Sequence, residues 1–136
     1  MPIQLDHAIV PSHNRVAAAK ALAGLLNVPW QESQGSFSPV FVNEALTLDF
    51  ADRDGFEGHH VCFRVDDAEF DAIFGRIKAA QIAYRSTPRG ENDMQINRRL
   101  GGKNVYWQDG DSHLWEMLTV SYARADSPPL AASPAS

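Results

Sequence analysis

The segment at residues 101–119 reads GGKNVYWQDGDSHLWEMLT, and it decides the fold. Two apolar runs, Val105–Trp107 and Leu114–Leu118, predict strands, and the Asp- and Gly-rich residues 109–112 between them predict a turn. Side chains alternate across a strand, so Glu116 must lie on the opposite face from its two bulky neighbours. Those neighbours need a covering layer, which predicts a helix on one face of the sheet and an acid on the other.

The sequence before this segment supplies that helix. Residues 59–65 predict a strand, and Asp66-Asp67 then provide a cap and first-turn negative charge for a helix through Gln81. A short strand at 82–84 follows, and then a polar loop at 89–93. The apolar face of the helix consists of Phe70, Ile73, Phe74 and Ile77.

The first half of the chain repeats this order of elements. Residues 3–10 predict a strand, and a break at Pro11, Ser12 and Asn14 follows, with Ser12 or Asn14 as the cap of a helix at 15–26. The remaining strands of this half are expected at 28–30, 37–42 and 46–50, the last two joined by a turn at Asn43-Glu44.

Superposition of the two halves places His7 on His60 and Asp49 on Glu116. The order β-α-β-β-β therefore occurs twice, in module one (residues 1–54) and module two (residues 58–122). Each module alone exposes a sheet face, so the two must pair, which predicts a single α+β domain over residues 1–122. Residues 123–136, rich in Pro, Ala and Ser, predict a disordered tail.

Composition narrows the function classes. The chain has 136 residues and a net charge of −5, which argues against a nucleic-acid partner. The longest apolar stretch, residues 16–28, is too short to span a membrane, and the N-terminus lacks a signal peptide, so a cytoplasmic protein is expected. Cys62 is the single cysteine, so any metal must be held mainly by nitrogen and oxygen.

Three segments resemble the vicinal oxygen chelate superfamily, which includes glyoxalase I, extradiol dioxygenases, fosfomycin-resistance transferases and bleomycin-resistance proteins. They are LDHAI at 5–9, HVCFRVDD at 60–67 and the segment at 101–119. The last resembles the family's aromatic strand, Asp-Pro-Asp-Gly-His turn and Glu-bearing strand. Here the turn reads DGDSH at 109–113, so the missing Pro and displaced Gly are expected to alter the turn and not the ligand strand.

The resemblance, which covers about residues 3–122, implies two paired βαβββ modules that form a curved, cup-like mixed sheet with helices outside. It also implies that His7, His60 and Glu116, on the first, fifth and eighth strands, hold one divalent metal. Two imidazoles and one carboxylate with open positions suit Fe(II), Mn(II), Ni(II) or Zn(II). A substrate can then bind the metal through two neighbouring oxygens.

Several other residues are candidates around this metal. His59 competes with His60, although it has the opposite parity on the strand. Asp49 falls where glyoxalase I-like members carry a fourth ligand, and its shorter side chain leaves open whether it is a ligand or a nearby acid. The catalytic candidates besides Glu116 are His113 and Tyr106, and the substrate-binding candidates are Arg64, Asn97, Arg98 and Trp107. By alternation, Tyr106 or Trp107 must pack in the core.

These patterns predict a metal-dependent enzyme acting on a small oxygen-rich molecule, either a lyase or isomerase or a ring-cleaving dioxygenase. The alternative is a metal-free drug- or metabolite-binding protein of the bleomycin-resistance type, and a third interpretation is a dimer with a vestigial site. The resemblance also implies a homodimer, in which one site takes His7 from one subunit and the other ligands from its partner. Neither a nucleic acid nor a membrane is an expected partner.

Overall fold

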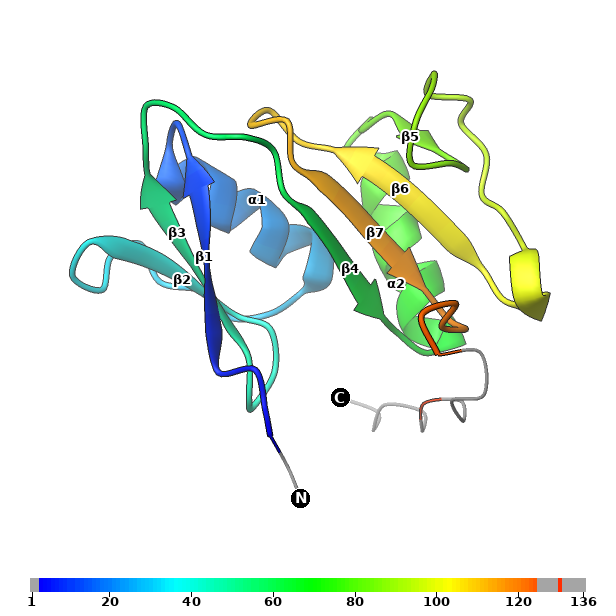
Figure 1. Ribbon diagram of the computed structural model, residues 1–136, viewed down its shortest axis with the longest axis horizontal. Coiled ribbons are helices and arrows are strands. Elements are labelled where there is room, and N and C mark those ends of the chain that lie inside the picture. Colours follow the sequence, from blue (N-terminus) through cyan, green and yellow to red (C-terminus); the bar gives the residue numbers. More distant parts are fainter. Residues whose placement is uncertain (1–2, 125–129, 131–136) are drawn as a thin grey trace. The chain divides into compact units, whose positions relative to one another are not determined.

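A computed structural model describes residues 3–124 and residue 130. The chain divides into two compact units, residues 1–57 and residues 58–136, which contain the expected modules 1–54 and 58–122. Each unit has its own sheet and its own long helix (Figure 1). That residues 1–122 act as one domain stays a prediction, and most of the predicted tail at 123–136 lies outside the described residues.

The first unit contains β1 (His7–Ser12), α1 (Arg15–Leu26), β2 (Phe37–Phe41) and β3 (Thr47–Asp52). Its sheet has the order β1-β3-β2, with β1 parallel and β2 antiparallel to β3. The strand expected at 28–30 is reduced to one isolated bridge, between Trp30 and Val40. Pro29 explains this reduction, because proline has no N–H to donate to a ladder.

Helix α1 has the bounds that the sequence predicts. The Asn14 side chain accepts a hydrogen bond from the backbone N–H of Ala17 at 3.1 Å, and Asn27 ends the helix in the left-handed conformation with φ of 57°. The predicted break at Pro11 and Ser12 is wrong, because both residues continue β1. Proline is tolerated there because β1 forms one edge of the three-stranded sheet.

The second unit contains β4 (His60–Arg64), α2 (Asp67–Ala79), β5 (Tyr84–Arg85), the 3₁₀ turn η1 (Arg99–Gly101), β6 (Asn104–Gln108) and β7 (Leu114–Leu118). Its sheet has the order β4-β7-β6-β5, with β4 and β7 parallel. A capping box begins α2: Asp66 accepts from the Glu69 N–H, and Glu69 accepts from the Asp66 N–H.

Strand register confirms the internal repeat. In the second unit His60 lies opposite Leu114 and Cys62 lies opposite Glu116. In the first unit His7 lies opposite Thr47, and the residue two positions later, Ile9, lies opposite Asp49. Asp49 and Glu116 therefore hold equivalent places relative to the two histidines, and the two-module α+β fold is confirmed.

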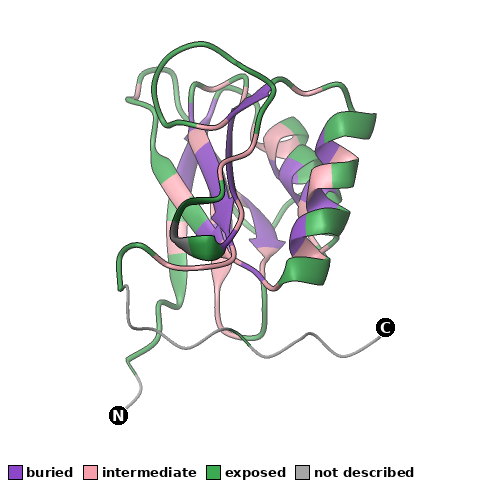
Figure 2. Cartoon of the chain, turned by 90° about the vertical axis from the view of Figure 1, so that its right-hand side faces the viewer, coloured by how far each residue is buried: buried purple, intermediate pink, exposed green. Residues whose placement is uncertain are grey.

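The core of the second unit lies between α2 and one face of its sheet. Buried positions fall on the strands and on parts of the helices (Figure 2). The large buried side chains of this core are Phe63, Phe70, Ile73, Ile77, Val105, Trp107, Trp115 and Met117. By alternation, the other face of the sheet carries His60, Cys62, Tyr106 and Glu116. Burial of the apolar face thus directs these polar side chains to the opposite side.

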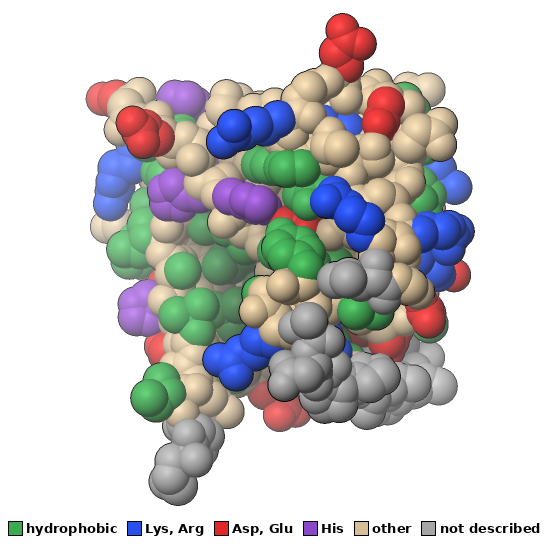
Figure 3. Space-filling model, turned by 45° about the vertical axis from the view of Figure 1, so that its right-hand side comes forward, with side chains coloured by type: hydrophobic (Ala, Val, Ile, Leu, Met, Phe, Trp, Pro, Cys, Tyr) green, Lys and Arg blue, Asp and Glu red, His purple; other side chains and the backbone are tan. Residues whose placement is uncertain are grey.

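Two features of the described residues concern membranes and charge. No helix within the described residues is both long and apolar enough to cross a membrane. On the face drawn in Figure 3, Lys and Arg side chains are interspersed with acidic and other side chains and form no large basic patch. This distribution agrees with the net charge of −5.

Candidate metal centre

Glu116 is the centre of a polar cluster on the open face of the second unit's sheet. Its side chain is fully buried, and His60 Nε2 lies 2.8 Å from its Oε1. The Tyr122 hydroxyl donates to the same oxygen at 2.9 Å, and the Asn104 amide donates to Oε2 at 2.6 Å. A buried carboxylate needs such partners, because removing a charge from water without them is costly.

A relay of two side-chain amides fixes the orientation of Glu116. Asn97 Nδ2 donates to the backbone carbonyl of Ser86 at 2.6 Å and to Asn104 Oδ1 at 3.0 Å. Because a carbonyl can only accept, Asn97 must present its NH₂ group, and Asn104 must turn its own NH₂ group toward Glu116. Oε2 is therefore held by an amide, and Oε1 is the oxygen that faces His60.

Three protonated side chains surround the carboxylate. Partial desolvation by the surrounding sheet, together with the negative charge of Glu116, raises the pKa of the Cys62 thiol to about 12, although the residue is exposed. The same two causes raise the pKa values of the Tyr106 and Tyr122 phenols. At neutral pH these groups are therefore hydrogen-bond donors and not anions.

The first unit carries the equivalent pair, His7 and Asp49. His7 Nδ1 lies 2.8 Å from Asp6 Oδ2, and this hydrogen bond is the main reason that the pKa of His7 is raised. The charges of Asp6 and Asp49 raise it further. With Nδ1 engaged by a carboxylate, Nε2 is the nitrogen that a metal would use, an arrangement common among metal-binding histidines. The role of Asp49 as a fourth ligand stays a prediction.

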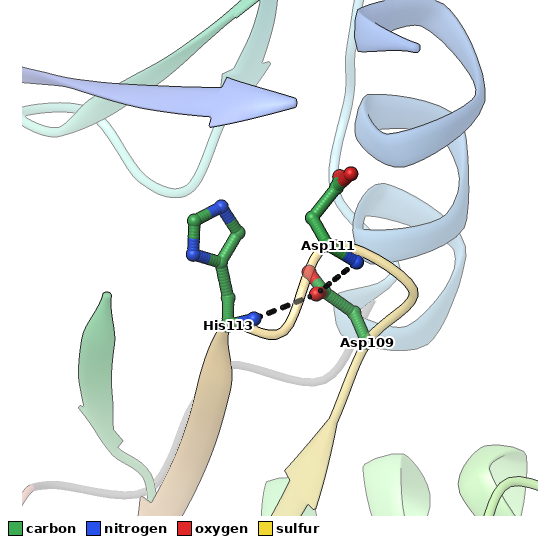
Figure 4. Close-up of side chains that lie close together, drawn as sticks. All are labelled: Asp109, Asp111 and His113. Atoms are coloured by element: carbon green, nitrogen blue, oxygen red, sulfur yellow. Dashed lines mark hydrogen bonds between the residues drawn. The ribbon is translucent and has the colours of Figure 1, made fainter. Parts of the chain in front are cut away.

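A second group of metal-compatible side chains, Asp109, Asp111 and His113, lies in the turn between β6 and β7, with ligand atoms within 4.8 Å of one another (Figure 4). The turn itself accounts for much of this arrangement. Asp109 Oδ1 accepts from the N–H groups of Asp111 and His113, both at 2.9 Å, and Oδ2 accepts from the Trp115 indole at 2.8 Å. Asp109 is therefore engaged as a turn-forming side chain.

His113, the sequence candidate for acid–base catalysis, belongs to the same turn. Its side chain is fully buried, its Nδ1 accepts from the His59 N–H at 2.8 Å, and its ring lies edge-on to Trp115. It precedes β7 with the parity of Trp115, opposite to that of Glu116. The fold thus uses His113 to anchor the chain before β4, and does not bring it to Glu116.

The other sequence candidates divide between the two faces of the sheet. Tyr106 lies opposite Glu116 in the strand register, and Arg64 lies on the same face as His60. Asn97 forms part of the amide relay. Trp107 is 2% exposed and packs in the core, so alternation assigns Tyr106 to the site and Trp107 to the interior. Arg98 borders a separate hollow beside the start of α2.

Sequence reasoning missed three residues of this region: Arg99, Asn104 and Tyr122. Asn104 had a usable signal, because it lies two residues before Tyr106 on a strand and therefore shares its face. Together with four others, the three line a cavity of about 330 Å³ in the second unit. Its lining consists of Asn97, Arg99, Lys103, Asn104, Tyr106, Val120 and Tyr122.

Known structures with a similar fold identify proteins related to this chain. The structure of Oxidase ChaP-H2 matches 92% of this chain and 99% of its own, with 35% identity and a TM-score of 0.85. Oxidase ChaP-H1 matches 90% and 100%, with 36% identity and a TM-score of 0.83. Structures described as a glyoxalase/dioxygenase, a lactoylglutathione lyase and FosX share the fold. The chain belongs to the vicinal oxygen chelate superfamily.

One structure with lower sequence identity is described as containing a metal ion. A FosX structure from Listeria monocytogenes, described as a complex with Mn(II) and 1S,2S-dihydroxypropylphosphonic acid, has 22% identity and a TM-score of 0.57, so the likeness concerns the fold alone. The fosfomycin resistance protein FosX of Mesorhizobium japonicum is 31% identical over 62 residues, which are 45% of this chain and 39% of that protein. No family model matches the chain.

Proposed function

We propose that this protein is a metal-dependent oxidative enzyme whose substrate binds one divalent metal through two neighbouring oxygens. The observation that carries the proposal is the pair formed by His60 and the fully buried Glu116, 2.8 Å apart on adjacent parallel strands. The names of the two oxidases, which are 35% and 36% identical to this chain, favour oxidation over the lyase or isomerase chemistry of other members.

The donor set fits a metal of this kind. In the proposal, His7 joins His60 and Glu116, so two imidazoles and one carboxylate hold the ion and leave positions open for substrate, as in sites for Fe(II), Mn(II), Ni(II) or Zn(II). The bound metal would act as a Lewis acid on the substrate oxygens. Asn104 supports the fit, since an amide donating to Oε2 orients Oε1 for coordination.

The chain's own residues have distinct tasks in this proposal. Asn97 and Asn104 hold the carboxylate in one orientation. The Tyr106 phenol, which stays protonated at neutral pH, donates a hydrogen bond to a substrate oxygen near Glu116, while the Tyr122 phenol donates to Glu116 Oε1. Glu116 and Tyr106 are buried, which limits competition from water at these two side chains.

Metal content tests the proposal directly. After reconstitution with Fe(II) or Zn(II), the wild-type chain should hold one equivalent, and His60→Ala and Glu116→Ala should lose it. His59→Ala is the matched control, because His59 is the sequence neighbour with the opposite parity, and it should keep the metal. A wild-type chain that holds no divalent metal would overturn the proposal in favour of a metal-free binding protein of the bleomycin-resistance type.

We also propose that the protein is a homodimer and that each site takes His7 from one subunit. Ile3 and Leu5, which precede β1, and Ile9, which lies on it, are 98%, 65% and 45% exposed, and a second copy would cover these apolar side chains. Mixing His7→Ala chains with Glu116→Ala chains should restore metal binding to half of the sites in each heterodimer. If recovery is absent, each site is built within one chain.

A further inference from the structure

The cavity beside Glu116 has an unusual charge pattern. Its lining contains two cationic residues, Arg99 and Lys103, and no acidic residue. Asn104 and Tyr122 both line the cavity and both donate to Glu116, so an amide and a phenol stand between the carboxylate and the cavity. We propose that this cavity is an anion-accepting subsite, and that the substrate carries a carboxylate or a similar anionic group that Arg99 binds.

Arg99 is the cation available for this contact. Lys103 Nζ lies 2.8 Å from Asp71 Oδ1 and 3.5 Å from Asp67 Oδ1, so helix α2 already neutralises its charge. Within the described part of the chain, no carboxylate forms an ion pair with Arg99. Arg99 and Tyr106 both line the cavity. The charge of Arg99 therefore reaches the cavity.

The other polar groups of the lining are already engaged. The Asn97 amide donates to Ser86 and Asn104, and the Asn104 amide donates to Glu116. Val120 and the two tyrosine rings supply apolar walls. A volume of about 330 Å³ is at the lower end for small-molecule sites, so one substituted ring fits better than a large ligand.

The inference rests on the proposed metal site and names its substrate class: a small, ring-sized compound with two adjacent oxygens for the metal and an anionic group for Arg99. A guanidinium–carboxylate contact has two parallel, charge-assisted hydrogen bonds, and a neutral amide cannot reproduce them. The charge of the substrate group that faces Arg99 should therefore control how tightly the protein binds the substrate.

Binding of a matched pair of probes to the Zn(II)-loaded protein tests this, because zinc holds the ligand without turnover. 3,4-Dihydroxybenzoate should bind about tenfold or more tightly than 3,4-dihydroxybenzamide in calorimetry, the difference expected for a hydrogen bond to a charged group. Arg99→Gln should reduce this ratio to near one, mainly by weakening the binding of the benzoate. Arg89→Gln, at an exposed residue that does not line the cavity, is the control and should keep the full ratio.

Two outcomes would overturn the inference while the metal proposal stands. They are equal binding of both probes by the Zn(II)-loaded wild type, and loss of the ratio in Arg98→Gln but not in Arg99→Gln. A second measurement separates the two proposals: benzoate and benzamide, which lack the adjacent oxygens, are compared on the metal-free protein by NMR titration. A preference for benzoate that needs Arg99 supports the subsite even in a chain that takes up no metal, and its absence there overturns the subsite.

Discussion

Asn104 donates to Glu116 Oε2 over 2.6 Å, and the two residues lie on adjacent antiparallel strands of one sheet. The amide fixes the second oxygen of the carboxylate while the first faces His60. Partners of this kind around a metal ligand set its orientation and basicity. Asn104 is therefore as much a part of the proposed centre as the ligand it holds.

Replacement of Asn104 by alanine should weaken metal binding by about 10- to 100-fold without abolishing it, the usual effect of losing a partner of a ligand. Competition with a chelator gives the affinity, and the visible spectrum of the Co(II)-substituted protein reports the changed ligand geometry. Gln108→Ala is a matched control, since Gln108 is an exposed residue on the same strand and face. An unchanged Co(II) spectrum in Asn104→Ala would contradict the proposal that Asn104 positions Glu116.

The Cys62 thiol should react slowly with alkylating reagents. Because the charge of Glu116 and partial desolvation raise its pKa, only a small fraction of this exposed thiol is the reactive thiolate at pH 8. Rates with iodoacetamide should rise with pH up to at least pH 10. Glu116→Gln should accelerate the reaction, because it removes a negative charge that raises the pKa of the thiol. Alkylation as fast as that of an unfolded control peptide at pH 8 would contradict this.

Asp93 should make the loop before β6 sensitive to acid. Hydrogen bonds from the Ser86 side chain and backbone hold its pKa below the usual value. A folded-state pKa below the unfolded one means that the interaction stabilises the protein above the unfolded pKa and is lost as the pH falls through the folded one. Asp93→Asn should therefore reduce the acid-side change in Tm, measured between pH 6 and pH 3. A parallel pH profile in the variant would contradict the assignment.

The turn before β7 should become more stable with glycine at position 112. Ser112 has φ of 64°, at the place where the family pattern has glycine, while Gly110 is not in the left-handed region. The left-handed conformation is unfavourable for a non-glycine residue, whereas glycine loses more chain entropy on folding. The first effect is larger, so Ser112→Gly should raise the free energy of unfolding by about 0.5–1 kcal/mol. The denaturation midpoint measures the gain.

The control for Ser112→Gly is Gly110→Ala, which meets open space and should change stability by no more than about 0.5 kcal/mol in either direction. Gly58→Ala should lower the free energy of unfolding, because its new Cβ would collide with the backbone carbonyl of Ser112. A loss of stability in Ser112→Gly would show that the serine side chain has a role of its own in this turn.

Much of the fold follows from local sequence signals. Helix α1 has its predicted bounds because Asn14 and Asn27 are strong cap residues, and β7 has its predicted bounds because an apolar run follows a clear turn signal at residues 109–112. Pro11 was misleading, since a proline usually ends a strand and here lies on an edge. The run at 28–30 forms only one bridge, because a short segment after a proline depends on its neighbour for pairing.

By itself, the sequence determined the two-module repeat and the face on which His60 and Glu116 lie, since both depend on periodicity along a strand. Only the tertiary structure decided that Asn104 holds Glu116, that Tyr122 donates to it, and that Arg99 borders the cavity. Contacts across strands depend on register, and residues 99 and 122 lie outside the sheet, where no periodic pattern dictates the direction of a side chain. Their positions follow from how the chain closes around the sheet.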